Sequence, residues 1–85
     1  MADTLARRVT DMIQSRLAHA VREAVVCEDT RLFEGGLNFD SITTMELISL
    51  TEQTFGVQYE HEDLTETNFQ TPHSISLVLA RRGAN

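Results

Sequence analysis

The sequence predicts an all-α domain built from three main helices and one short helical segment. Apolar residues recur at helical spacing in three stretches, and the apolar fraction of 41% is typical of a folded protein. One proline and four glycines leave few breaks in the chain, which favours helices. Because the chain has 85 residues, we expect residues 1–85 to form a single domain with a thin core.

The first helix is predicted to begin near Asp3 or Thr4, either of which could cap it, and to end near Arg22. Its core-facing stripe has helical spacing and consists of Leu5, Val9, Met12, Ile13 and Leu17. Residues 23–40 show no sustained periodicity, so they form a long connection of the kind that is often functional. We expect its apolar side chains to hold it against the helices as an ordered loop: Val25, Val26, Leu32, Phe33, Leu37 and Phe39.

The second helix is predicted over residues 41–55, with Asp40 as its N-cap and Gly56 as its left-handed C-terminal residue. Its core-facing side chains are Leu47, Ile48, Leu50 and Phe55. Another ridge, partly apolar and flanked by acids, suggests a surface for a partner protein, made of Ile42, Met45, Glu46, Ser49 and Glu52. Helical spacing alone leaves ordinary core packing open for Ile42 and Met45.

The last third of the chain contains a short helical turn and a final helix. Residues 57–59 are extended, and residues 60–66 are expected to form a helical turn whose acids suit the start of a helix dipole. Thr71 is an N-cap and Pro72 suits the first helical position. The final helix then runs to about Arg82 and ends at Gly83.

The charge pattern argues against nucleic-acid binding. The net charge is -6, all seven bases are arginine, and none lies between Leu32 and Ala80. This distribution predicts that the middle of the domain repels nucleic acid and attracts basic protein surfaces. No apolar run is long enough for a membrane span, and the N-terminus lacks the apolar stretch of a signal peptide. A single cysteine, Cys27, fits a cytoplasmic location.

The residue types needed for metal binding or hydrolysis are not assembled in the sequence. Three histidines lie far apart and Cys27 has no second cysteine, so a structural zinc site is not expected. The acids beside His61 are best interpreted as a solvated turn. Ser41 lacks the glycines of a nucleophile elbow, and Gly35-Gly36 is not followed by the residues of a phosphate-binding loop. We therefore expect a protein that is not an enzyme.

Ser41 is nevertheless the candidate site. It follows the predicted cap Asp40, so its hydroxyl lies in the first turn of a helix, where an attached phosphate is stabilised by backbone N–H groups and the dipole. Covalent modification of Ser41 is one interpretation. An unmodified interaction module, in which Asp40 and Ser41 only start a helix, is the other.

The chain resembles the acyl carrier proteins. Residues 32–42 are similar to that family's loop and attachment signature, in which Asp-Ser-Leu precedes the second helix. Residues 44–48 and 55–57 are similar to the pattern along and after that helix, and the similarity continues through Leu64, Phe69 and residues 71–78. Asn38 and Ile42 replace the usual Gly and Leu, and Thr43 replaces a common acid. Thr51 replaces a common apolar residue and is expected to loosen the core.

The resemblance implies a four-helix carrier bundle with 4′-phosphopantetheine on Ser41. A phosphopantetheinyl transferase would attach the group from coenzyme A, with Asp40 supporting the step. The terminal thiol would then carry acyl groups as thioesters between acyl-loading, condensing or acyltransferase enzymes with basic surfaces. A free-standing, cytoplasmic monomer of this kind would serve fatty acid, polyketide or related synthesis. A carrier for an activated amino or aryl acid is the alternative within the class.

Overall fold

The computed structural model describes residues 2–84, with side chains described from Leu5 onwards. The main helices are α1 (Ala2–Arg16), α3 (Ser41–Phe55) and α4 (Pro72–Arg81). Two short helical segments join them, α2 (Ala18–Val21) and the 3-10 helix η1 (His61–Asp63). No strand occurs in residues 2–84, so the all-α carrier-bundle class is confirmed.

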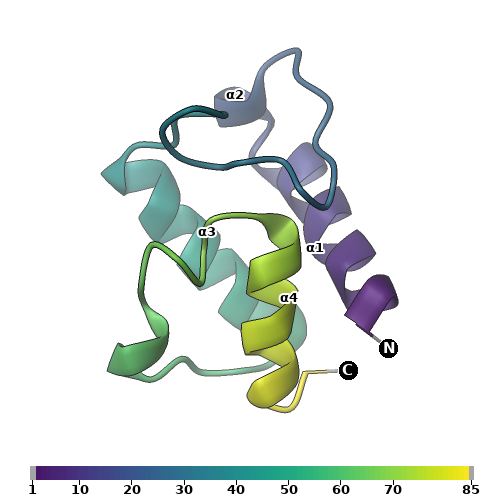
Figure 1. Ribbon diagram of the computed structural model, residues 1–85, viewed down its shortest axis with the longest axis vertical. Helices are drawn as coiled ribbons and strands as arrows, with labels where there is room; N and C mark the ends of the chain where they lie inside the picture. Colours follow the sequence, from purple (N-terminus) through teal and green to yellow (C-terminus); the bar gives the residue numbers. More distant parts are fainter. Residues whose placement is uncertain (1, 85) are drawn as a thin grey trace.

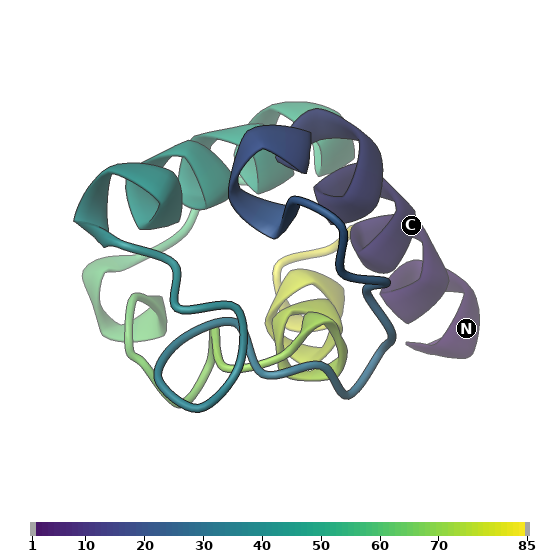
Figure 2. The same ribbon diagram turned by 90° about the horizontal axis from the view of Figure 1, so that it is seen from above.

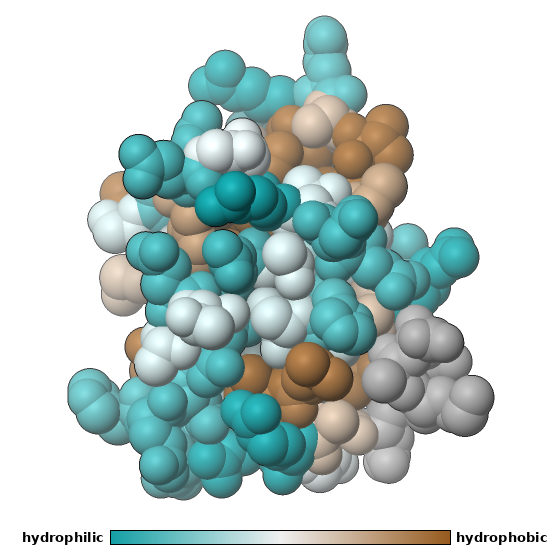
Figure 3. Space-filling view, viewed as in Figure 1, coloured by the Kyte–Doolittle hydropathy of each residue, from teal (hydrophilic) through white to brown (hydrophobic). Residues whose placement is uncertain are grey.

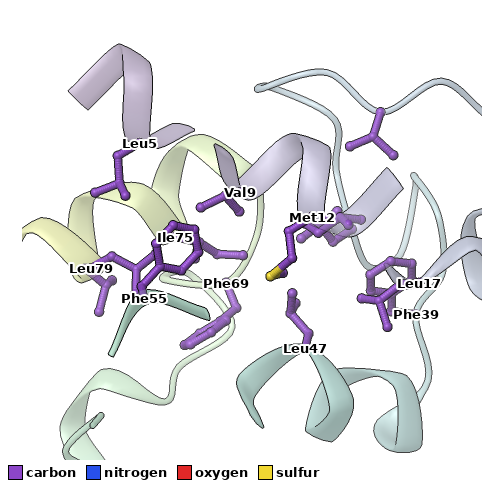
Figure 4. Close-up of a cluster of buried hydrophobic side chains, with 14 of the residues drawn as sticks. Leu5, Val9, Met12, Leu17, Phe39, Leu47, Phe55, Phe69, Ile75 and Leu79 are labelled. Atoms are coloured by element: carbon purple, nitrogen blue, oxygen red, sulfur yellow. The ribbon is translucent and has the colours of Figure 1, made fainter. Parts of the chain in front are cut away.

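The three main helices surround one core. Figures 1 and 2 show α1 and α3 as long helices inclined to one another, with α4 beside them and the loop between α2 and α3 closing one end. Figure 4 shows the side chains that meet between the helices, among them Val9, Leu47, Phe55 and Ile75. The apolar stripe predicted for the first helix is buried throughout, from Leu5 to Leu17. Hydrophilic residues cover most of the face in Figure 3, where apolar residues appear in separate patches.

The predicted first helix begins close to the expected position, but its predicted cap and its predicted end are wrong. The helix already includes Ala2, so Asp3 and Thr4 lie inside it and do not precede it as caps. It ends at Arg16, and the chain restarts as the four-residue α2. Leu17 lies at the break with non-helical angles (φ -116°, ψ 34°), and its side chain is fully buried. The apolar pattern continues through this break because Leu17 and Val21 both face the core.

Arg22 ends α2 in a conformation that favours glycine. Its φ is 62° and its ψ is -123°, while the Ala24 N–H donates to the Val21 carbonyl at 3.2 Å. These are the angles of the first central residue of a type II′ turn, a position where a side chain causes strain.

The long connection is an ordered loop, as predicted. Five of its six apolar side chains are buried or packed on the core, whereas Val25 is 78% exposed, which makes the prediction wrong there. Gln14 of α1 holds the start of the loop, because its side-chain amide donates to the Ala24 carbonyl and accepts from the Val26 N–H. The Leu32 N–H donates to the Gln70 carbonyl at 2.9 Å, which ties the loop to the segment before α4.

The core around Thr51 is not loosened, contrary to expectation. Thr51 is fully buried, and its hydroxyl donates to the carbonyls of Leu47 and Ile48 at 3.0 and 2.9 Å. The same oxygen accepts a hydrogen bond from the Tyr59 hydroxyl at 2.7 Å. Burial raises the pKa of Tyr59 to about 12. A polar residue is accommodated here because each of its hydrogen-bonding groups has a partner.

The acidic turn after α3 differs from the predicted solvated turn. It contains only the three residues of η1, and Asp63 at its end is 3% exposed. The Asp63 carboxylate accepts from Arg82 Nε at 2.6 Å and from Arg82 Nη2 at 3.0 Å. These hydrogen bonds hold the pKa of Asp63 below its usual value. The prediction for α4 is confirmed, with Thr71 as its N-cap and Pro72 as its first residue.

Candidate functional site

The candidate site is the turn that begins α3. Asp40 has an extended backbone, and its Oδ1 accepts a hydrogen bond from the Thr43 N–H at 2.8 Å. Asp40 is therefore the predicted N-cap. The same hydrogen bond is the main reason that the pKa of Asp40 is lowered. The Thr44 hydroxyl donates to the Asp40 carbonyl at 2.8 Å, which adds a second connection across the turn.

Ser41 is the first residue of α3 and is exposed. Within residues 2–84 its hydroxyl makes no hydrogen bond, so it is free to react with a group brought from outside. The first turn of a helix also presents backbone N–H groups that lack partners inside the helix. A phosphate joined to the Ser41 oxygen would lie beside these groups and at the positive end of the helix dipole. The residues present therefore fit a phosphate ester.

The preceding loop positions this turn. Phe39 is buried, and its N–H donates to the Leu32 carbonyl at 2.9 Å. Asn38 has a φ of 56°, which confirms that asparagine takes the unusual backbone angles of this position. A side chain at Gly36 would place its Cβ 1.9 Å from the Arg31 carbonyl oxygen, so only glycine fits at this position. The hydroxyl of Ser41 is thus exposed on a backbone that is fixed on its N-terminal side.

The ridge predicted as a partner surface lies on the outside of the protein. Ile42 is 70% exposed and Met45 is 68% exposed, which excludes core packing for both. Glu46 and Ser49 are also exposed and follow at helical spacing. Glu46 has a neighbour from α2, because its Oε1 lies 3.2 Å from His19 Nε2. The structure therefore brings four of the five residues together beside Ser41.

Glu52 is the fifth residue, and the structure gives it a contact within the chain. It is half-buried, and its Oε2 accepts a hydrogen bond from the Tyr59 N–H at 2.9 Å. This contact holds the extended segment that follows α3. Sequence spacing cannot reveal the contact, because it depends on how the chain turns after Gly56.

A hollow that sequence reasoning missed lies beside α3, and we call it the α3 hollow. Its volume is about 240 Å³, and its lining residues are Phe33, Thr44, Ile48, Leu64, Thr65, Glu66 and Phe69. Thr44 and Ile48 follow Ser41 by three and seven residues, so the hollow begins about one helical turn from Ser41. These residues come from three separate segments of the chain, and their proximity is a consequence of the tertiary fold.

Other kinds of site find no support in the described part of the chain. Residues 2–84 contain no group of three histidine, cysteine, aspartate or glutamate side chains that could hold a metal ion. A larger hollow of about 670 Å³ lies between α1, the loop and α4, and no residue of α3 lines it. Between residues 2 and 84 no helix is both long enough and apolar enough to cross a membrane.

Comparison with known families gives a match that covers most of the chain. The family model described as a phosphopantetheine attachment site matches residues 7–78, which include the loop, the whole of α3 and most of α4. A search of curated proteins finds no significant match. The matched region contains Asp40, Ser41 and the four exposed residues of the α3 ridge.

Proposed function

Because the chain belongs to the phosphopantetheine-attachment family, we propose that it is an acyl carrier protein with Ser41 as its attachment residue. Its cofactor is 4′-phosphopantetheine, and its role is that of a carrier and not of a catalyst. The bound group supplies a terminal thiol that holds acyl groups as thioesters. The observation that carries the choice of residue is the exposed, unpaired hydroxyl of Ser41 at the capped start of α3.

The chain's own residues have three tasks in this function. Ser41 supplies the oxygen that displaces adenosine 3′,5′-bisphosphate from coenzyme A on a phosphopantetheinyl transferase, and its proton passes to that enzyme. Asp40 fixes the helix start through the Thr43 N–H and stays ionised, since its pKa is lowered. The backbone N–H groups of the first turn stabilise the negative charge that the ester adds.

The exposed ridge of α3 is the proposed surface for partner enzymes. Ile42 and Met45 provide its apolar centre, and Glu46 provides a carboxylate for a basic group on the partner. Ser49 extends the ridge by one turn. Glu52 contributes less than we expected from the sequence, because its carboxylate already accepts the Tyr59 N–H.

The proposed cargo is an acyl chain of fatty acid, polyketide or related synthesis. The α3 hollow supports an aliphatic group, since Phe33, Ile48, Leu64 and Phe69 line it and it lies near Ser41. The acid before Ser41 also differs from the histidine that many peptidyl carriers have at that position. A carrier for an amino or aryl acid remains the alternative within this class.

Intact-mass measurement tests the proposal. Incubation with coenzyme A, Mg²⁺ and a broad-specificity transferase should add one phosphopantetheine to the wild-type chain. Ser41→Ala should stay unmodified while its circular dichroism spectrum remains that of the folded protein. A wild-type chain that stays unmodified with several transferases would instead favour an unmodified interaction module.

A further inference from the structure

An ion pair between the buried Asp63 and Arg82, whose side chain is 31% exposed, connects the segment after α3 to the end of α4. The side chain of Asp63 is 4% exposed, and Arg82 directly follows α4. Two nitrogens of the Arg82 guanidinium donate to the two carboxylate oxygens of Asp63, at 2.6 and 3.0 Å. Paired contacts of this kind fix orientation as well as distance. The C-terminal end of α4 therefore holds η1 in one position.

Asp63 also organises the segment to which it belongs. Its Oδ2 accepts the Glu60 N–H at 2.8 Å, which closes η1 at its start. Its backbone carbonyl accepts the side-chain amide of Asn68 at 3.0 Å, and the Asn68 carbonyl accepts the Ser74 hydroxyl at 2.9 Å. One residue thus joins the start of η1, the turn that follows it and the first turn of α4.

The residues that follow Asp63 form the outer wall of the α3 hollow. Leu64, Thr65 and Glu66 lie on this wall, opposite Thr44 and Ile48 of α3. Leu64 is 44% exposed, while Phe69 is buried with its ring edge-on to Tyr59 at a centroid distance of 5.2 Å. The width of the hollow therefore depends on where residues 64–69 lie relative to α3.

We propose that Asp63 and Arg82 are positioning residues that hold the outer wall of the α3 hollow, and so determine how far an aliphatic acyl group is enclosed there. The part of this inference that concerns the acyl group rests on the proposed function, whereas the position of the wall does not. Removal of Arg82 leaves the buried Asp63 carboxylate without its counter-charge, which is strongly unfavourable. Replacement of Asp63 removes both hydrogen bonds to the Arg82 guanidinium, which within residues 2–84 then keeps only its 3.9 Å contact with Glu62. The segment then gains stability by moving outward into water, and the hollow opens.

Hydrogen exchange on the unloaded protein tests the wall. Arg82→Ala should raise the exchange rate of amides in residues 60–70 by at least about tenfold, and Asp63→Asn should raise it by a smaller factor, with little change in α1 for either variant. Arg81→Ala is the matched control, because Arg81 is an exposed arginine at the same helix end. Arg82→Lys keeps the charge, loses the paired geometry and should give a smaller change. Equal exchange of residues 60–70 in Arg82→Ala and Arg81→Ala would overturn the inference.

Thioester cleavage by hydroxylamine on the loaded protein tests the acyl group. The octanoyl thioester should react several-fold faster in Arg82→Ala and Asp63→Asn than in wild type, whereas the acetyl thioester should react equally in all. Identical octanoyl rates in wild type and both variants would contradict enclosure behind this wall. A wild-type chain that cannot be loaded would instead disprove the proposed function, while the exchange measurement still decides the role of the ion pair.

Discussion

The two ends of α3 are held in different ways. At the start, the backbone of the loop and the Asp40 carboxylate fix the chain, and the side chains of Ser41 and Ile42 point into solvent. At the far end, side chains hold the chain in place, because the buried Thr51 and the half-buried Glu52 both form hydrogen bonds with Tyr59. Ser41 is the proposed attachment residue and must be exposed for that role, and the order around it comes from backbone contacts that leave its side chain free. We therefore expect stability and partner recognition to respond to different ends of the helix.

The largest expected effect lies at Phe69, whose ring packs edge-on against the Tyr59 that holds the far end of α3. Phe69→Ala should lower the free energy of unfolding by about 3–5 kcal/mol, because it removes a large side chain that is 2% exposed. Ile42→Ala at the exposed end should change it by no more than about 0.5 kcal/mol. Urea denaturation followed by circular dichroism measures both. If the free energy of unfolding fell by similar amounts in the two variants, the two ends of α3 would not differ as we expect.

Alkaline pH should destabilise the fold through Tyr59, which contacts the far end of α3. The pKa of Tyr59 is raised from 10.0 to about 12, so the fold keeps the phenol neutral while the unfolded chain ionises. The stability that depends on a neutral Tyr59 is fully present below pH 10. It is lost as the pH rises towards 12, which lowers the free energy of unfolding by about 2–3 kcal/mol in total. Urea midpoints measured from pH 9 to 12 should show this fall, and Tyr59→Phe should remove most of it. An unchanged slope in Tyr59→Phe would assign the alkaline loss to other groups.

Arg22→Gly should stabilise the protein, by about 1 kcal/mol, because glycine adopts the angles of this turn without strain. Arg22→Ala is the matched control, since it removes the same side chain and keeps a Cβ. A thermal melt should show a higher midpoint for the glycine variant than for the alanine variant. Equal midpoints would show that the turn relaxes around a side chain.

The smallest effect should separate the two acids of α3. Glu46→Lys should lower the kcat/KM of the transferase reaction by a factor of up to about five and change the free energy of unfolding by no more than about 0.5 kcal/mol, because it reverses an exposed charge whose contact with His19 is also exposed. Glu52→Gln should lower stability and leave kcat/KM unchanged, since it weakens the hydrogen bond from the Tyr59 N–H. Transferase kinetics and thermal melts on both variants test the division. Unchanged kinetics for Glu46→Lys with every partner would remove Glu46 from the recognition surface.

Local chemistry made the helix ends of α3 and α4 predictable. The N-caps Asp40 and Thr71 and the left-handed Gly56 depend on residues within one turn, so the sequence contains the whole signal. The break at Leu17 was missed because an apolar residue suits both a continuous helix and a buried break. The bond between Asp63 and Arg82 joins residues 19 apart, and the acids around Asp63 suggested a solvated turn. Contacts between residues so far apart in the sequence depend on how whole helices pack, so sequence spacing alone does not reveal them.

Gly36 has a consequence for how this protein would behave in a mutational scan. Any other residue there meets the Arg31 carbonyl, so the loop must shift and move the turn that presents Ser41. A selection for carrier activity would then rank position 36 with the proposed attachment residue, although Gly36 has no side chain of its own. Intolerance to substitution would therefore mark the support of the site as strongly as the site itself. Measuring folding beside activity for each variant would tell the two kinds of position apart.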